Sequence, residues 1–284
     1  MQTKADTLPL DISPDTPLRP PRRADLLRTP LWPWEVRGLP RAIRRVVADV
    51  AGTPPVMVVP GLYANDRAMQ PLRRYLYRAG YNAFGWGLGR NLAGEDHPST
   101  QADLGESWSF GPPKQKDGGE ANVPALADRL GARIRAQSEK LGRPISLVGW
   151  SLGGFLAREA ARDLPRHVDA VITLGSPLIG GPKYTFVRER FARKGMDVDW
   201  VEAQTRARHD HRPLRCAVTS IYSYKDAVVH WSASLDRWTP GARHFETGCT
   251  HAAFGFHPPT LAQVKSELDR VHAKSRKYSL AQDR

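Results

Sequence analysis

The sequence predicts an α/β protein built on a mostly parallel sheet with helices on both faces. Short apolar runs alternate with stretches of helical periodicity, and this alternation is typical of repeated strand–helix–strand units. The strand at 145–149 is apolar on both faces, so we expect it at the centre of the sheet. The other predicted strands cover residues 55–60, 81–88, 170–174, 217–222 and 243–247, and the predicted helices cover 66–79, 124–141, 152–164 and 259–273.

Residues 1–38 stand apart from this alternation. They are rich in proline and arginine and show no sustained strand or helix period, so we expect an extended or partly disordered lead-in. We expect one α/β domain over residues 39–284. It opens with an amphipathic helix, because its apolar residues recur at helical spacing: Leu39, Ile43, Val46, Val47 and Val50.

Two connections are too long for simple turns. Residues 89–121 hold many glycines and prolines with little apolar periodicity, and loops of that length are usually functional or disordered, so we expect a variable or lid segment. Residues 177–213 combine many arginines and lysines with Phe186, Val187, Phe191 and Trp200. This composition is enough for one or two amphipathic helices outside the sheet, which we interpret as a cap.

Composition excludes several classes of protein. No stretch approaches the roughly 18 uncharged apolar residues of a membrane span, and the first residues lack the apolar core of a signal peptide, so we expect a cytoplasmic protein. Two cysteines, Cys216 and Cys249, build neither a disulfide scaffold nor a four-cysteine zinc site. His209 and His211 lack a nearby third ligand. We expect no metal and no cofactor.

The chain is strongly basic, with 42 Lys and Arg against 29 Asp and Glu and a formal charge of +13, which favours anionic partners. The basic cap and residues 31–50, with Trp32 and Trp34, have two interpretations. They either dock on an anionic membrane surface, or the tryptophans cover the protein's own core while the arginines are solvated. We favour the second. Nucleic acid is a less expected partner, because no recognised motif accompanies the charge. The oligomeric state is not predicted.

The motif Gly149-Trp150-Ser151-Leu152-Gly153 lies between an apolar strand and a helix-forming stretch, the context in which G-x-S-x-G forms a nucleophile elbow. The neighbouring chains approach so closely at such a turn that only glycine fits two positions either side of the serine. The serine Oγ is then exposed above the sheet at a helix N-terminus, which favours developing negative charge. The motif is short enough to arise by chance, so it needs partners.

A nucleophilic serine needs an imidazole base and a carboxylate that orients the imidazole. Because ligands bind at the carboxyl ends of parallel strands, each partner should follow a strand. Asp226 follows the predicted strand 217–222, and His251 follows 243–247. The competing Asp236 lies away from a strand end and is expected to pair with Arg237 on the surface.

Other histidines and the cysteines have simpler interpretations. His230, His244 and His257 are expected to have surface or packing roles. Cys249 is expected to be a packed thiol near His251, and in strands of this length it lies about 20 Å from Cys216, too far for a disulfide.

In several ordered blocks the sequence resembles the α/β-hydrolase superfamily, specifically its bacterial lipase- and esterase-like members. The likeness covers roughly residues 52–272, in 58–62, 85–91, the elbow, 174–177 and the turns at Asp226 and His251. It implies Ser151 as nucleophile, Asp226 as orienting acid and His251 as base. It also implies an oxyanion hole formed by the backbone N–H groups of Leu62 and Leu152. The antiparallel strands that often open this family's sheet are not evident, so the access route and substrate size are not predicted.

The predicted function is that of a serine hydrolase that cleaves a small-molecule or lipid carboxylic ester through an acyl-enzyme. Acyl transfer or thioester cleavage at the same triad is an alternative, because the acceptor is chosen by the pocket. A second alternative is a non-enzymatic basic protein that binds a lipid surface or nucleic acid on a hydrolase-like scaffold.

Overall fold

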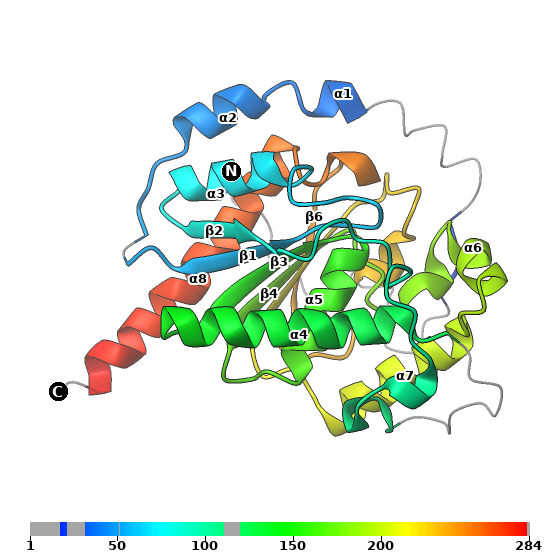
Figure 1. The fold of residues 1–284 in the computed structure, drawn as a ribbon. Helices are drawn as coiled ribbons and strands as arrows, with labels where there is room; N and C mark the ends of the chain where they lie inside the picture. The colour runs from blue at the N-terminus through cyan, green and yellow to red at the C-terminus, as the bar shows by residue number, and fades with distance from the viewer. Residues whose placement is uncertain (1–17, 22–31, 51, 111–119, 283–284) are drawn as a thin grey trace.

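The computed structural model of the protein describes residues 18–21, 32–50, 52–110 and 120–282. Most of the predicted lead-in therefore lies outside the described residues. Its described part contains the short helix α1 (Trp32–Glu35), and α2 (Leu39–Arg45) follows. Both lie along the outer edge of the molecule (Figure 1).

The helix predicted from Leu39 ends earlier than its apolar pattern suggests. Val46, the C-cap residue of α2, has an extended backbone with ψ of 133°. Val46 and Val50 pack against the core beside α3, whereas Val47 between them is 70% exposed. A helix would have turned all three toward one side, and an extended backbone suits β-branched side chains.

Six parallel strands form one sheet in the order β2-β1-β3-β4-β5-β6, which confirms the predicted fold class. The strands are β1 (Pro55–Val59), β2 (Asn82–Gly85), β3 (Ile145–Trp150), β4 (Val168–Leu174), β5 (Ala217–Tyr222) and β6 (Arg243–Glu246). β3 pairs with β1 and β4 and is buried on both faces, as expected of a central strand. β2 is shorter than predicted, because the N–H groups of Trp86 and Gly87 bind the Asp66 carboxylate instead of extending the ladder.

Helices cover both faces of the sheet. α4 (Asn122–Leu141) and α5 (Leu152–Arg162) pack on the face that carries Met57 and Leu147. α3 (Gln70–Arg78) and α8 (Pro258–Gln282) cover the opposite face, which carries Val56 and Val148 (Figure 1). No helix in the described part of the chain is both long enough and apolar enough to cross a bilayer.

The predicted cap contains two helices, α6 (Arg188–Arg193) and α7 (Val198–His211), which lie together at one end of the sheet (Figure 1). The long 89–121 connection has some structure of its own, because residues 101–103 and 106–108 form two short 3-10 helices. The second places Trp108 in the core, where the Arg208 guanidinium lies 3.9 Å from the ring centre. The connection is therefore anchored to the cap helix α7.

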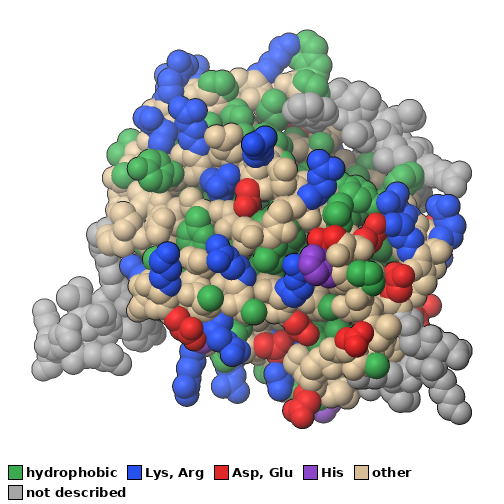
Figure 2. Space-filling model, in the orientation of Figure 1, with side chains coloured by type: hydrophobic (Ala, Val, Ile, Leu, Met, Phe, Trp, Pro, Cys, Tyr) green, Lys and Arg blue, Asp and Glu red, His purple; other side chains and the backbone are tan. Residues whose placement is uncertain are grey.

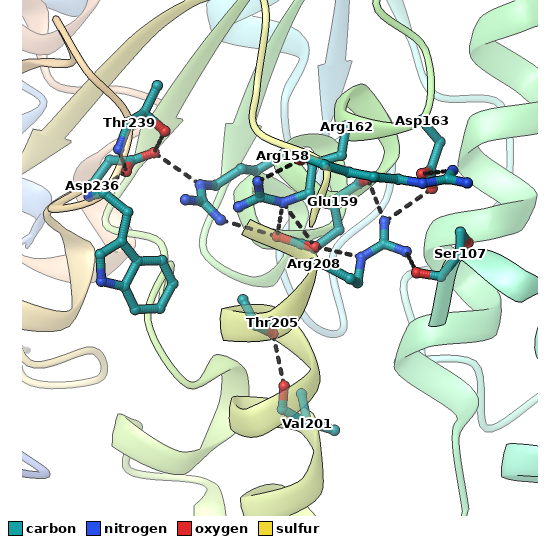
Figure 3. Close-up of polar contacts among 12 residues, drawn as sticks. Ser107, Arg158, Glu159, Arg162, Asp163, Val201, Thr205, Arg208, Asp236 and Thr239 are labelled. Carbon is teal, nitrogen blue, oxygen red and sulfur yellow. Dashed lines mark hydrogen bonds and ion pairs between the residues drawn. The ribbon is translucent and has the colours of Figure 1, made fainter. Parts of the chain in front are cut away.

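A buried ion-pair network joins α5 to the cap. Figure 3 shows Arg158, Arg162 and Arg208 directed toward the Glu159 carboxylate, and the Arg208 Nε lies 3.0 Å from Glu159 Oε2. The network also corrects the expectation for Asp236. This residue is 2% exposed, and its Oδ2 accepts from Arg158 Nε at 2.9 Å, whereas the sequence predicts a surface pair with Arg237. Packing of the 236–239 turn against α5 supplies a partner that is remote in sequence.

Candidate active site

Ser151 occupies a sharp turn between β3 and α5. Its φ of 55° and ψ of −127° are unusual for a non-glycine residue, and such strain is typical of functional turns. The flanking glycines are needed for close packing. A Cβ on Gly149 would lie 2.4 Å from the Cα of Gly154, and one on Gly153 would lie 2.4 Å from the Val59 carbonyl oxygen. The turn has the geometry expected of a nucleophile elbow.

The structure brings together the three side chains that the sequence singled out. The Ser151 Oγ lies 2.9 Å from His251 Nε2, and His251 Nδ1 lies 2.7 Å from Asp226 Oδ2. Because an ionised carboxylate only accepts hydrogen bonds, the His251 proton belongs on Nδ1, and the Nε2 lone pair then faces the serine hydroxyl. This arrangement can transfer a proton from Ser151 to His251.

Neighbouring backbone N–H groups hold the Asp226 carboxylate in position. Asp226 lies in the turn after β5, and its Oδ1 accepts from the N–H groups of Val228 at 2.8 Å and Val229 at 2.9 Å. Oδ2 is then free to face His251. Ser151 and His251 are each 9% exposed and Asp226 is 6% exposed, so the row is largely shielded from water while one end reaches a cavity.

Leu62 and Leu152, the predicted oxyanion donors, lie beside Ser151 at the same cavity. Leu152 is the first residue of α5, and N–H groups in a first helical turn have no acceptor within their helix. Leu62 lies in the turn after β1, which the buried Asn91 holds in place. The Asn91 carbonyl oxygen accepts from Tyr63 N–H at 2.7 Å, and its side chain donates to the Pro60 carbonyl at 2.8 Å.

The cavity has a volume of about 200 Å³, and its lining is mostly apolar. The cap supplies much of its wall, through Pro182, Thr185, Val187 and Phe191. Ser151 and His251 are its reactive groups. A pocket of this kind can receive an apolar group next to a nucleophile.

Comparison with known proteins gives a match in structure only. No protein-family model matches the chain, and no curated protein matches it in sequence. The solved structure of the lipase BlEst2 from Bacillus licheniformis matches with a TM-score of 0.50 at 14% identity, covering 80% of this chain and 95% of that one. An α/β-hydrolase enzyme, MGS-MChE2, from a sediment metagenome of the Mar Chica lagoon matches with a TM-score of 0.48 at 18% identity, covering 76% of this chain and 90% of that one. The chain has the α/β-hydrolase fold.

Within this α/β-hydrolase fold, two residues not assigned a role from the sequence hold the His251 turn. The Trp150 indole N–H donates to the His251 carbonyl at 3.0 Å, and the two rings lie 5.7 Å apart. The Glu35 carboxylate, on α1, accepts from the N–H of Thr250 at 2.9 Å and from its hydroxyl at 2.7 Å. Trp150 lies inside the elbow motif and could have been noticed, whereas no sequence signal connects Glu35 to this site.

The other histidines considered as alternatives to His251 form hydrogen bonds with other partners. The His244 Nε2 lies 3.0 Å from the Asp236 carbonyl oxygen, the His230 Nδ1 contacts Ser232, and the His257 Nδ1 contacts Thr260. In the described part of the chain, no three His, Cys, Asp or Glu side chains gather as a set of metal ligands.

Both cysteines, Cys216 and Cys249, are free thiols. Burial raises the pKa of the Cys216 thiol to about 12 and also raises the pKa of Cys249. Neither thiol forms the thiolate that a cysteine nucleophile requires at neutral pH.

Proposed function

We propose that the protein is a serine hydrolase that cleaves carboxylic esters through an acyl-enzyme intermediate. The observation that carries the proposal is the row in which Ser151 Oγ, His251 and Asp226 are joined at 2.9 and 2.7 Å, with the serine opening into an apolar cavity. An aligned nucleophile, base and orienting acid are the parts that acyl transfer to serine requires.

In the first half of the proposed reaction, Ser151 Oγ attacks the ester carbonyl carbon while His251 Nε2 takes the hydroxyl proton. The carbonyl oxygen becomes an oxyanion that the N–H groups of Leu62 and Leu152 stabilise. His251 then donates its proton to the leaving alcohol as the carbon–oxygen bond breaks. Asp226 stays ionised and stabilises the imidazolium.

In the second half, His251 removes a proton from water, and the resulting hydroxide attacks the acyl-enzyme. The acid leaves as His251 returns a proton to Ser151 Oγ. The apolar wall formed by Val187 and Phe191 of the cap favours an uncharged acyl group, because an unpaired charge would lose its hydration there.

Substitution of the nucleophile tests this proposal. Ser151→Ala should reduce hydrolysis of a p-nitrophenyl ester by at least about 10³-fold, because the covalent route is lost. The matched control, Ser109→Ala, removes an exposed hydroxyl that donates a hydrogen bond to the Glu106 carbonyl oxygen, and it should hydrolyse the ester at the wild-type rate. A fluorophosphonate probe should label the wild type and the control but not Ser151→Ala.

Full activity of a folded Ser151→Ala variant, or probe labelling at another serine, would contradict the assignment. Assays of the wild type with matched esters, thioesters and alcohol acceptors then measure which acyl acceptor and leaving group the pocket prefers.

A further inference from the structure

We propose that the groove between α2 and α3 is a docking site for anionic phospholipid headgroups at a bilayer surface. This inference goes beyond ester hydrolysis and does not depend on it. The groove is separate from the catalytic cavity and has a volume of about 390 Å³. Arg44 of α2 and Arg74 of α3 line it together with the apolar side chains of Leu39, Pro40, Ile43 and Pro71.

The two arginines have no anionic partner among the described residues. Neither forms an ion pair, and no carboxylate lines the groove. A guanidinium binds phosphate oxygens through paired N–H groups, so two guanidiniums in one apolar groove match a phosphate next to the apolar part of a lipid.

The surrounding face repeats this pattern of unpaired positive charge. Seven arginines on and beside α2 and α3 are exposed and have no carboxylate partner in the described part of the chain: Arg37, Arg41, Arg44, Arg45, Arg67, Arg74 and Arg78. Figure 2 shows basic side chains gathered over these helices, while acidic side chains lie mostly lower on the same face.

The carboxylates of this region are already engaged. Glu35 binds Thr250, Asp49 lies 2.6 Å from the Lys265 Nζ, and Asp66 accepts from the N–H groups of Trp86 and Gly87. Glu35 and Asp66 keep their negative charge, because their partners are neutral, but the seven exposed arginines outnumber them. The local charge is therefore positive, and an anionic partner would neutralise it.

Exposed apolar side chains on α1, on α3 and in the extended segment after α2 favour a bilayer over a nucleic acid. Trp34 is 61% exposed, Val47 70% and Tyr77 72%. The Arg37 guanidinium lies 3.4 Å from the centre of the Trp34 ring. Trp34 therefore does not cover the core, contrary to the interpretation favoured from the sequence. Aromatic and aliphatic groups beside arginines suit the headgroup zone of a membrane, whereas an aliphatic group such as Val47 gains nothing from a phosphate backbone.

Vesicle flotation of the full chain tests the site. At about 0.1 M salt the protein should float with phosphatidylcholine vesicles that contain roughly 30% phosphatidylglycerol and stay unbound with phosphatidylcholine alone. Arg44→Gln with Arg74→Gln should weaken binding roughly 30-fold, since each basic residue near an anionic surface contributes about fivefold. Arg44→Lys with Arg74→Lys keeps the charge but loses the paired N–H donors, so its binding should lie between that of the glutamine variant and that of the wild type.

A control of equal charge uses the opposite face of the sheet. Arg135 and Lys140 are exposed on α4, and Arg135→Gln with Lys140→Gln should change binding less than about twofold, because salt screens charges beyond roughly 10 Å. Unchanged thermal midpoints show that each double variant is folded. Ser151→Ala should float like the wild type, which keeps this result separate from the test of catalysis.

Three results would overturn the proposal. The first is equal flotation with neutral and anionic vesicles. The second is an equal loss of vesicle binding in the glutamine variants of the groove and of α4. The third is binding to a short duplex DNA at protein concentrations that leave anionic vesicles free, which would assign the face to nucleic acid.

Discussion

Trp150 contributes to the candidate site in two ways. Its N–H holds the His251 carbonyl at 3.0 Å and its ring lines the cavity. Trp150→Phe removes the donor, and its smaller ring also enlarges the cavity. We expect kcat to fall about tenfold, because a looser His251 turn misaligns the base, while a change in KM reports the altered cavity wall.

A second tryptophan provides the matched control for that prediction. The Trp238 Nε1 is buried without a hydrogen-bond partner, so Trp238→Phe removes a donor that holds nothing. Steady-state kinetics of both variants on the same ester make the comparison. If the two substitutions lowered kcat equally, the Trp150 hydrogen bond would have no special role in positioning His251.

The residues of the candidate site differ in how far sequence could predict them. Ser151, Asp226 and His251 each follow a strand, and parallel strands place their carboxyl ends along one edge, so topology alone brings the three together. Glu35 is different. It contacts Thr250 across 215 residues from a helix that belongs to no strand–helix–strand unit. Only packing of α1 on the finished domain creates that contact.

The network between α5 and α7 determines how firmly the cap is attached. Arg208 of α7 has a fully buried side chain that binds Glu159 Oε2 at 3.0 Å and Asp163 Oδ2 at 2.9 Å, and it also binds the Ser107 carbonyl oxygen. Arg208→Met keeps much of the side-chain volume and removes these bonds. We expect a loss of about 3–5 kcal/mol in the free energy of unfolding, measured by urea denaturation, because buried partners lose their counter-charge.

Arg206, on the same helix, provides the control for this prediction. It is 51% exposed and lies 3.6 Å from Asp210, so Arg206→Gln should cost less than about 0.5 kcal/mol. Faster proteolysis within α7 in the Arg208 variant alone would locate the loosening in the cap. Similar losses from both substitutions would show that the buried network does not attach the cap.

Hydrophobic periodicity predicts the helices and strands but not where each one ends. The strands and helices were predictable, because the spacing of their apolar residues follows from which side of each element is buried. The end of α2 at Arg45 was not, because Val46, Val47 and Val50 fit a helical pattern as well as the extended path that packing selects. Asp236 was misassigned for a similar reason, since its partner Arg158 lies 78 residues away on α5.

On the scale of the whole molecule, buried carboxylates make the stability of this basic protein depend on pH. Burial opposes the ionisation of Glu159, but the guanidiniums of Arg162, Arg208 and Arg158 outweigh it and lower the pKa of Glu159 to about 2. Burial likewise opposes the ionisation of Asp236, and Arg158 and the Thr239 hydrogen bonds outweigh it and lower its pKa. A carboxylate with a lower pKa in the folded state stabilises that state above its unfolded pKa of about 4.

The free energy of unfolding should therefore fall as pH drops from about 5 toward 2, because the unfolded chain then binds more protons than the folded one. Burial raises the pKa of Asp128 and works in the opposite direction, but among the described carboxylates this one group stands against Glu159 and Asp236. Glu159→Gln should be less stable than the wild type at pH 7 by a few kcal/mol. The difference should shrink as the pH falls, since protonation of Glu159 removes from the wild type the same negative charge that the variant lacks.

Urea denaturation at several pH values measures how the free energy of unfolding depends on pH, with Asp210→Asn as the control. Asp210 is 56% exposed, so its variant should run parallel to the wild type at every pH. Because the positive charge of the whole chain grows in all three proteins as carboxylates become protonated, self-repulsion cancels from the comparison. A wild-type minus Glu159→Gln difference that stays constant from pH 7 to about 3 would show that the ionisation of Glu159 does not stabilise the fold.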